Sequence, residues 1–458
     1  MRVLDYVRVA SFDPNVFLDQ LGTIEITSAA PDYAEALYQD VRAKGGNARI
    51  VEAPQGAEIC VLTEGLTADR PAKRHHEVLK AIFSVGAGAR TIILDHASAE
   101  RFSDIGGTPG LCRSIRIEQP DFEISSLSLS LSETGVQHAS LVSQALNLVS
   151  GDYILRDDGI WQDVPGKEIK PVDQTDAVIG SPVWLITGGG RGVTADCAVE
   201  LAKRTKGQFI LLGRSDVVSW PEWLESETDL KTLRGMLAKN TGRPGVPQKL
   251  PEIDRLARKL LASAEIASTL DAIAAAGGNA TYVPSDIGDR SSLKKILENL
   301  SEQFGTVTGL VHGAGILSDG LATSLTLTSF ETVFTPKVLG LETILSCLDL
   351  NALKHIGLFS SASAVFGNQG QANYAAANAW LNNVAVQLAE TLPHAQVKSF
   401  CWGPWQGGMV DETLARMFTE RGIGLITKSE GARIFADQLL HSSHNQVRFV
   451  IGDEWGNP

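Results

Sequence analysis

The feature that most limits the fold is an alternation of short apolar runs with amphipathic segments, which recurs along almost the whole chain. In the first third, apolar runs at 23–27, 58–62 and 91–94 have the length of strands, and helical patterns begin at Pro31 and near His76. Pro31 suits the first turn of a helix, because the N–H that it lacks has no partner there. Strands that alternate with helices predict an α/β fold, with a parallel sheet covered by helices on its faces.

The same rhythm restarts more strongly at Pro182 and predicts a second α/β unit stacked on the first. Its expected strands are 183–186, 209–212, 281–283, 309–311 and 357–359, and its expected helices are 195–203, 266–275, 293–304, 329–348 and 374–390. We place the boundary in the polar stretch 167–180, which gives units at 1–178 and 179–458. The segment 216–265 separates the second expected strand from its helix and is longer than a minimal α/β unit requires. An insertion of this size usually folds as a helical piece of its own. It either caps the far end of a bound ligand, contacts a neighbour or only covers the surface.

Length and charge exclude several classes of protein. The 458 residues are enough for two or three domains, and a net charge of −13 without a long run of Lys and Arg argues against a nucleic-acid partner. No apolar stretch approaches the roughly 20 residues that span a bilayer, and the N-terminus lacks a signal-peptide pattern. We therefore expect a cytoplasmic protein with no membrane partner. The five cysteines are scattered without paired spacing, which predicts neither a disulfide framework nor a metal site.

A glycine-rich turn stands between the strand 183–186 and the helix that follows it. The turn consists of Thr187, Gly188, Gly189, Gly190, Arg191, Gly192 and Val193. Glycine lets the backbone approach a pyrophosphate closely, and the start of a helix offers free N–H groups and the positive end of its dipole. In this context the turn predicts a dinucleotide site in a Rossmann-like unit. The first unit has Thr-Ser-Ala-Ala at 27–30 instead, so we expect it to be a structural partner without a second cofactor site.

Three further strand ends are expected to meet the dinucleotide, because open α/β sheets bind ligands at the carboxyl ends of their strands. They carry Gly213, Arg214 and Ser215; Asp286 and Ile287; and His312, Gly313, Ala314 and Gly315. The first of these ends lacks the Asp or Glu that holds the ribose hydroxyls of NAD. Arg214 suits a forked contact with a 2′-phosphate, which predicts NADPH; the alternative is a solvated surface arginine. Asp286 is expected to accept from the adenine amino group.

The reaction centre is expected around Tyr374, which has Asn378 four residues on and hence on the same face of a helix. A tyrosine donates a proton to a carbonyl oxygen as hydride reaches the carbon, if a nearby cation lowers its pKa from about 10. Ser361 follows the fifth strand of the second unit and is placed to hydrogen-bond the same oxygen. These residues predict the reduction of a ketone.

With these motifs the second unit, from about 181 to 452, resembles the short-chain dehydrogenase/reductase superfamily. Most members have a lysine where this chain has Asn378. In the ketoreductase domains of modular polyketide and related fatty-acid synthases, the lysine and the asparagine exchange places, and Lys337 in Thr-Pro-Lys-Val-Leu-Gly matches that pattern. The resemblance implies catalytic roles for Lys337, Ser361, Tyr374 and Asn378. Otherwise Lys337 is a solvated helix lysine and Asn378 is a capping or packing residue.

The resemblance also implies a truncated, non-catalytic first subdomain, which the sequences at 110–114 and 118–121 match. It implies NADPH-dependent reduction of a 3-oxoacyl thioester on an acyl carrier protein, beside other synthase domains. Pro404 and Trp405 are expected at the cofactor, and Asp319, Phe366, Gln371 and Met409 at the substrate. Leu-Ser-Asp at 317–319 is similar to the Leu-Asp-Asp fingerprint of ketoreductases that give the 3R alcohol, with Ser318 departing from it, and Phe366 is not the tryptophan that marks the opposite class. The resemblance therefore implies the 3R alcohol, unless Asp319 only caps a turn. The long insert most resembles ketoreductases of iterative synthases, such as those that make polyunsaturated fatty acids.

Several alternatives stay open. The segment after Trp405 either closes over the substrate, hinged at 407–408 with Leu414 and Met417 as an apolar wall, or is an ordinary core helix. The basic stretch 73–76 is either a docking patch for the carrier protein or a solvated helix turn. The alternatives to a synthase ketoreductase are a reductase of a free small ketone and a non-catalytic NADPH-binding scaffold.

Overall fold

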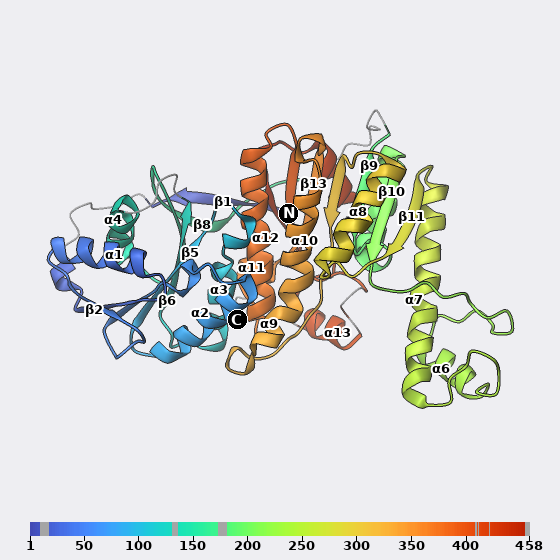
Figure 1. The fold of residues 1–458 in the computed structure, drawn as a ribbon, viewed down its shortest axis with the longest axis horizontal. Helices are drawn as coiled ribbons and strands as arrows, with labels where there is room; N and C mark the ends of the chain where they lie inside the picture. The colour runs from blue at the N-terminus through green and yellow to red at the C-terminus, as the bar shows by residue number, and fades with distance from the viewer. Residues whose placement is uncertain are drawn as a thin grey trace.

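The computed structural model describes residues 1–9, 18–130, 136–172, 181–407, 410, 412–420 and 422–453. Within them the strands form one 15-stranded sheet in the order β11-β10-β9-β12-β13-β14-β15-β1-β8-β7-β6-β5-β4-β2-β3. Figure 1 shows two α/β units side by side along the long axis of the molecule, the N-terminal one in blue and the C-terminal one in green to red. The predicted α/β class with two Rossmann-like subdomains is confirmed.

The C-terminal unit has the strand order of a dinucleotide-binding fold. Its strands are β9 (Val183–Thr187), β10 (Gln208–Gly213), β11 (Asn279–Pro284), β12 (Gly309–His312), β13 (His355–Ser361), β14 (Gln396–Trp402) and β15 (Arg448–Ile451). Its helices include α5 (Gly192–Thr205), α8 (Arg290–Phe304), α9 (Leu327–Phe334), α10 (Gly340–Cys347), α11 (Ser363–Phe366), α12 (Ala372–Thr391), α13 (Glu412–Glu420) and α14 (Lys428–His441). The strands are parallel to one another, and the chain reverses its direction of travel across the sheet between β9 and β12. Ligands bind at such a switch point.

The N-terminal unit repeats this plan in a shorter form. Its parallel strands are β2 (Thr23–Thr27), β3 (Asn47–Val51), β4 (Ile59–Leu62), β5 (Arg90–His96), β6 (Ile124–Ser130) and β7 (Asp152–Arg156), and β8 (Gly159–Glu168) returns antiparallel to β7. Its helices are α1 (Pro31–Ala43), α2 (Pro71–Val85), α3 (Thr108–Glu118) and α4 (Val136–Ala145). Where the second unit has its glycine turn, the Thr27 hydroxyl donates to Glu64 (2.9 Å) and the Thr63 hydroxyl donates to the Thr27 carbonyl (2.7 Å). Side chains of Thr63 and Glu64 therefore contact the carboxyl end of β2, at the place that corresponds to the glycine turn.

The two units are joined edge to edge and are not stacked. The strand β1 (Arg2–Arg8), which the sequence did not predict, lies antiparallel between β8 and β15 and so belongs to both units. The expected stacking is wrong, because pairing on both edges of β1 makes the sheets of the two units continuous. The expected boundary at 178 lies in 173–180, outside the described residues, and stays a prediction.

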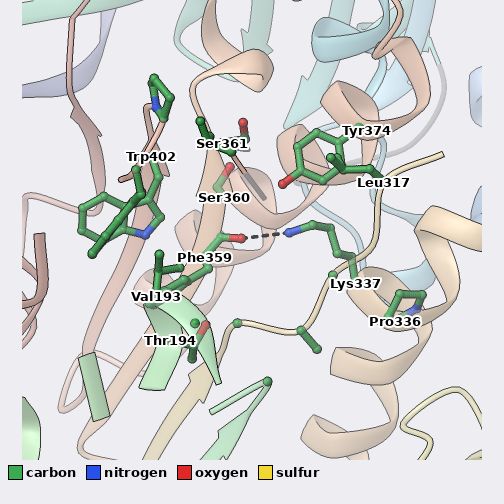
Figure 2. A pocket seen from close by; sticks show the side chains of 18 of the residues that line it. Val193, Thr194, Leu317, Pro336, Lys337, Phe359, Ser360, Ser361, Tyr374 and Trp402 are labelled. Carbon is green, nitrogen blue, oxygen red and sulfur yellow. Dashed lines mark hydrogen bonds between the residues drawn. The ribbon is translucent and has the colours of Figure 1, made fainter. Parts of the chain in front are cut away.

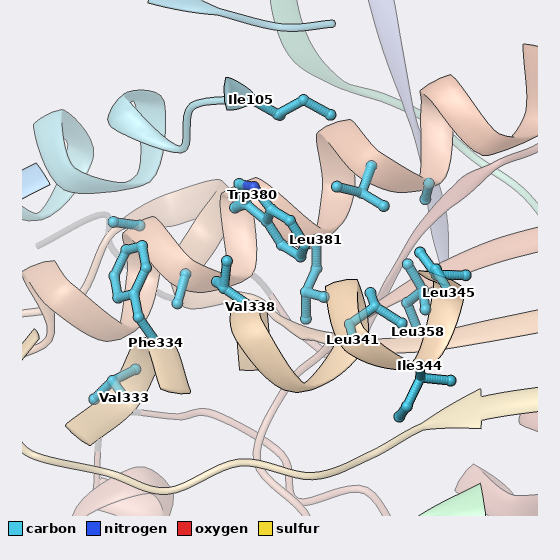
Figure 3. Close-up of a cluster of buried hydrophobic side chains, with 14 of the residues drawn as sticks. Ile105, Val333, Phe334, Val338, Leu341, Ile344, Leu345, Leu358, Trp380 and Leu381 are labelled. Atoms are coloured by element: carbon cyan, nitrogen blue, oxygen red, sulfur yellow. The ribbon is translucent and has the colours of Figure 1, made fainter. Parts of the chain in front are cut away.

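One apolar cluster crosses the seam between the units. It includes Val78, Ile82, Ile105, Leu111 and Ile115 from the first unit and Phe334, Val338, Leu341, Trp380 and Leu381 from the second. Figure 3 shows Trp380 and Leu381 of α12 above the side chains of α9 and α10 and below Ile105. The Trp380 indole N–H also donates to the Phe102 carbonyl, at 3.0 Å. The two units therefore share a core. Burial of each such side chain stabilises it by roughly 1.5–3 kcal/mol.

Two of the four residues of the basic stretch 73–76 are buried at this seam. Arg74 is 1% exposed and donates to the carbonyls of Ser103 (2.9 Å) and Ile105 (2.6 Å). His75 is also buried and packs on Phe334, with 5.0 Å between ring centroids. Lys73 is the exposed cation of the stretch, with 52% of its side chain accessible, and it pairs with Asp69 at 2.9 Å. The stretch is therefore not the exposed basic cluster that the docking interpretation needs.

The insert folds as a helical arm that Figure 1 shows projecting beyond the β11 edge of the sheet. It holds α6 (Leu230–Ala238) and the first half of α7 (Leu250–Ala275), around a small core of Leu224, Leu233, Leu237, Ile253, Ala257 and Leu260. The helix α7 runs unbroken for 26 residues across the expected insert end at 265, and its second half is the helix expected at 266–275. The insert end stays a prediction. In the described part of the chain, no helix is long and apolar enough to cross a membrane.

Candidate active site

A cleft of about 1650 Å³ opens at the carboxyl ends of the central strands of the second unit. The predicted residues that line it are Gly188, Gly190, Arg191, Gly192, Val193, Gly213, Arg214, Ser215, Ile287, Gly313, Ala314, Gly315, Asp319, Lys337, Ser361, Gln371, Tyr374, Pro404 and Trp405. The predicted residues outside this lining are Thr187, Gly189, Asp286, His312, Phe366 and Asn378. Met409 lies outside the described residues. One cleft thus joins the glycine turn to the expected reaction centre.

The glycine turn closes tightly against the next strand ends. Gly188 has a φ of +73° and donates its N–H to the Leu212 carbonyl at 2.8 Å. A Cβ at Gly188 would lie 3.0 Å from the backbone of Gly313, so a larger residue does not fit between the two strand ends. Arg191 occupies the N-cap position of α5 without a side-chain capping bond, and the first residues of the helix line the cleft. This geometry fits a pyrophosphate at a helix N-terminus.

The end of β10 offers cationic and hydroxyl donors. Arg214 is exposed and lines the cleft, and the described residues give it no ion pair. The Tyr282 hydroxyl donates to the Ser215 carbonyl at 2.9 Å and fixes the turn. Asp216, the next residue, forms an ion pair with Lys259 of the insert at 2.9 Å. The donor set therefore fits a phosphate better than a pair of ribose hydroxyls.

The end of β11 differs from the expectation. Ile287 lines the cleft, but Asp286 is exposed and accepts from the Gly288 N–H at 3.0 Å. Ser285 lines the cleft instead, and its buried hydroxyl has no hydrogen-bond partner among the described residues. A serine in a strand–loop junction gives no sequence signal, so this candidate for an adenine contact was missed.

His312 and Thr187 position the backbone and do not line the cleft. The His312 ring hydrogen-bonds the Thr187 hydroxyl (2.9 Å) and the Lys337 carbonyl (3.1 Å), and the Thr187 hydroxyl accepts from the Ala314 N–H (3.2 Å). Burial, together with the Lys337 ammonium, lowers the pKa of His312 to about 3, so the ring is neutral. A neutral buried histidine at this place connects the glycine turn to the helix that carries Lys337.

Three of the predicted catalytic side chains, those of Lys337, Ser361 and Tyr374, lie close together at the cleft, as Figure 2 shows. Lys337 lies in a π-helical turn (Thr335–Leu339) between α9 and α10; such turns often occur at functional sites. Its Nζ donates to the Phe359 carbonyl at 3.0 Å and lies 5.3 Å from the centroid of the Tyr374 ring. The Lys337 amine and the Tyr374 hydroxyl therefore face the same space.

Ser361 is held by a residue that the sequence did not single out. The Ser361 hydroxyl oxygen accepts from the N–H (3.2 Å) and the hydroxyl (2.9 Å) of Ser363. Because Ser361 only accepts in these two bonds, its own proton stays available for a ligand. This arrangement orients Ser361 as a hydrogen-bond donor toward the cleft.

The acidity expected of Tyr374 is not what the structure shows. Burial raises the pKa of Tyr374 to about 12, and the charge of Asp319 adds to the rise. Burial also lowers the pKa of Lys337 to about 7. We expected the ammonium to lower the pKa of the phenol, but desolvation by burial is the largest cause and acts in the opposite direction.

Asn378 and Phe366 stand behind the cleft. The side-chain amide of Asn378 donates to the Tyr374 backbone carbonyl at 2.8 Å, and the backbone carbonyl of Asn378 accepts from the Ser360 hydroxyl at 3.0 Å. The buried side-chain oxygen Oδ1 of Asn378 has no partner among the described residues. Phe366 packs at the seam against Leu4, Val365, Cys401 and Val450 and does not touch the cleft, so the expected substrate contact is wrong for Phe366.

The segment after Trp405 forms one wall of the cleft. Leu414, Met417 and Phe418 of α13 line it, together with Val410 and Ile423. Gly407 has a φ of +86°, a conformation that favours glycine at the entry to this wall. The interpretation of α13 as an ordinary core helix is therefore wrong.

Fold and site together define a dinucleotide-binding reductase of the short-chain dehydrogenase/reductase kind. Residues 182–407 match the family model described as KR domain. The chain belongs to the ketoreductase domains of type I polyketide and polyunsaturated fatty acid synthases.

Two curated relatives illustrate the match. A polyunsaturated fatty acid synthase protein of Thraustochytrium sp. is 31% identical over 377 residues, which is 80% of this chain and 13% of that protein. The polyketide synthase PksN of Bacillus subtilis is 27% identical over 358 residues, which is 76% of this chain and 6% of that protein. The chain thus spans only a small part of the length of these relatives.

Solved structures share the whole fold. The ketoreductase from the first module of phoslactomycin biosynthesis in Streptomyces sp. HK803 has a TM-score of 0.70 at 19% identity, covering 98% of this chain and 92% of that one. A ketoreductase domain from the bacillaene assembly line has a TM-score of 0.66 at 19% identity, covering 98% and 96%. Both units, including the N-terminal one, are therefore present in known ketoreductases.

Proposed function

We propose that this domain reduces the ketone of a 3-oxoacyl thioester, carried by an acyl carrier protein, to the 3-hydroxyacyl thioester with NADPH. The observation that carries the proposal is the convergence of Lys337, Ser361 and Tyr374 on a cleft that also holds the glycine turn. The relatives are synthases of polyunsaturated fatty acids and polyketides, which supports a carrier-bound substrate and other synthase domains as partners. A cytoplasmic location stays a prediction.

The roles of the side chains follow from their hydrogen bonds. A bound reduced nicotinamide supplies the hydride for the ketone carbon. Tyr374 donates a proton to the ketone oxygen, and Ser361 donates a hydrogen bond to the same oxygen, since Ser363 already satisfies its acceptor capacity. Lys337 places a positive charge beside the ring of Tyr374, which favours the phenolate left after proton transfer. Asn378 fixes the turn of α12 below Tyr374.

The choice of NADPH over NADH rests on the end of β10. Arg214 and Ser215 line the cleft there, and the next residue in the chain, Asp216, pairs with Lys259. A guanidinium and a hydroxyl suit a 2′-phosphate. The proposed stereochemistry, a 3R alcohol, rests on Leu317 and Asp319. Both line the cleft, and Asp319 accepts a hydrogen bond from Gln371.

The test compares NADPH consumption on 3-oxoacyl thioesters of graded length, attached to a carrier protein or to a short thiol, with chiral analysis of the alcohol. We expect turnover with the carrier-bound substrate and a 3R product. Turnover of a free small ketone with no gain from the carrier would favour the alternative reductase, and no turnover with tight NADPH binding would favour the scaffold.

A further inference from the structure

The N-terminal unit reaches into the cleft through the last turn of α3. Arg116, Ile117 and Pro120 belong to this turn and the residues after it, and they line the same cleft as Tyr374. Ile117 is 40% exposed, although it is a large apolar side chain. The unit without a glycine turn therefore supplies part of the wall around the reaction centre.

Glu118, at the end of this helix, holds two loops of the other unit at once. One carboxylate oxygen accepts from the Gly370 N–H at 2.8 Å, and the other accepts from the Ala322 N–H at 2.7 Å. Each is a hydrogen bond to a charged acceptor, which is about twice as strong as a neutral one. One half-buried carboxylate thus joins the loop before α12 to the loop after Asp319.

These two loops carry Asp319 and Gln371, which line the cleft. The Gly320 N–H donates to the Gly370 carbonyl at 2.9 Å, and the Gln371 amide donates to Asp319 at 3.0 Å. The Asn373 amide donates to the Ser318 carbonyl at 3.0 Å, one residue before Tyr374. A change in the spacing of the loops would therefore move Asp319 relative to the Tyr374 hydroxyl.

We propose that Glu118 is a positioning residue through which the N-terminal unit fixes the substrate loops and so sets which face of the ketone is reduced. This inference rests on the proposed reduction. It makes the N-terminal unit part of the active site, beyond its role as a packing partner.

The test uses Glu118→Gln, which keeps the shape of the side chain but leaves one oxygen as an acceptor, so that only one loop can be held. Glu118→Asp, whose shorter carboxylate spans the two N–H groups less well, is the second variant, and Glu123→Gln is the matched control at an exposed site nearby. We expect amide hydrogen exchange in 317–325 and 367–374 to become faster by roughly tenfold in Glu118→Gln, as the loss of a charged hydrogen bond implies.

The stereochemical readout separates positioning from stability. We expect Glu118→Gln to lower kcat/KM by roughly tenfold and to raise the share of the minor alcohol, with the Kd for NADPH unchanged, because the glycine turn lies at the other end of the cleft. Unaltered exchange in the two loops would overturn the proposal, and so would an unaltered product ratio in an active enzyme. If the wild-type chain reduces no thioester, the proposed function fails, while the exchange comparison still decides the role of Glu118.

Discussion

At the scale of single residues, Lys337 is a normally charged side chain that lies almost fully buried at the cleft. It is 3% exposed, and burial lowers its pKa from 10.5 to about 7. Below about pH 7 the lysine is charged in both the folded and the unfolded chain, so the full cost of burying the charge is present. Between about pH 7 and 10.5 the unfolded chain binds more protons, and stability therefore rises with pH through this window.

This gives a prediction for Lys337→Met. The variant should be more stable than the wild type at about pH 7, and this advantage should shrink by roughly 2–4 kcal/mol as the pH approaches 10. Urea unfolding at a series of pH values measures the difference. Lys294→Met, at an exposed lysine of α8, is the control and should show no such trend. Parallel curves for wild type and Lys337→Met would contradict the assigned burial of the charge.

Arg214 gives a second prediction at this scale. Arg214→Ala should raise the Kd for NADPH by roughly 10- to 100-fold and leave the Kd for NADH almost unchanged, because only NADPH carries the phosphate that the guanidinium would bind. Fluorescence titration with both cofactors measures this. Arg255→Ala, at an exposed arginine of the insert, is the control. An equal loss of affinity for the two cofactors would mean that Arg214 does not bind the 2′-phosphate.

At the scale of elements, the contact of α3 with α12 depends on a glycine. A Cβ at Gly110 would overlap the Ala375 carbonyl of α12 and approach Ala379. We expect Gly110→Ala to destabilise the protein by roughly 1–3 kcal/mol, since the two helices must separate. Gly235→Ala in α6 is the control, because a Cβ there meets nothing within 4 Å, and it should stabilise slightly. Thermal unfolding of both variants tests the contact.

Local signals in the sequence predicted some elements well and others not at all. The helix α1 begins at Pro31 as predicted, because the proline and the glycines after it mark both ends. The strand β14 was missed, since Lys398 and Ser399 break its apolar run, although both are fully buried there. The Lys398 ammonium is accommodated by the carbonyls of Ser443 and Gln446, a contact that no local pattern indicates.

The candidate site was predictable to the extent that its residues lie in short motifs. The glycine turn and the residues around Tyr374 meet in one cleft as predicted. Ser285, Ser363 and Glu118 were not predicted, because their importance comes from contacts with segments that are distant in the sequence or from an orientation that only the fold fixes. The raised pKa of Tyr374 was also beyond the sequence, since it depends on burial.

At the scale of the whole molecule, the continuous sheet and the shared core predict that both units unfold together. The cluster that joins Leu111 and Ile115 to Trp380 has no gap at the seam. We expect one cooperative transition, coincident for far-UV circular dichroism and for the loss of NADPH binding. Two separate transitions would mean that the units are independently stable.

The proposed reduction depends on Tyr374, which delivers the proton to the ketone oxygen. The most direct measurement is the rate of NADPH oxidation with a carrier-bound 3-oxoacyl thioester for the wild type, Tyr374→Phe and the control Tyr38→Phe in α1. We predict a loss of roughly 10²- to 10⁴-fold in Tyr374→Phe with unchanged NADPH binding, and no loss in the control. An unchanged rate in Tyr374→Phe would contradict the account.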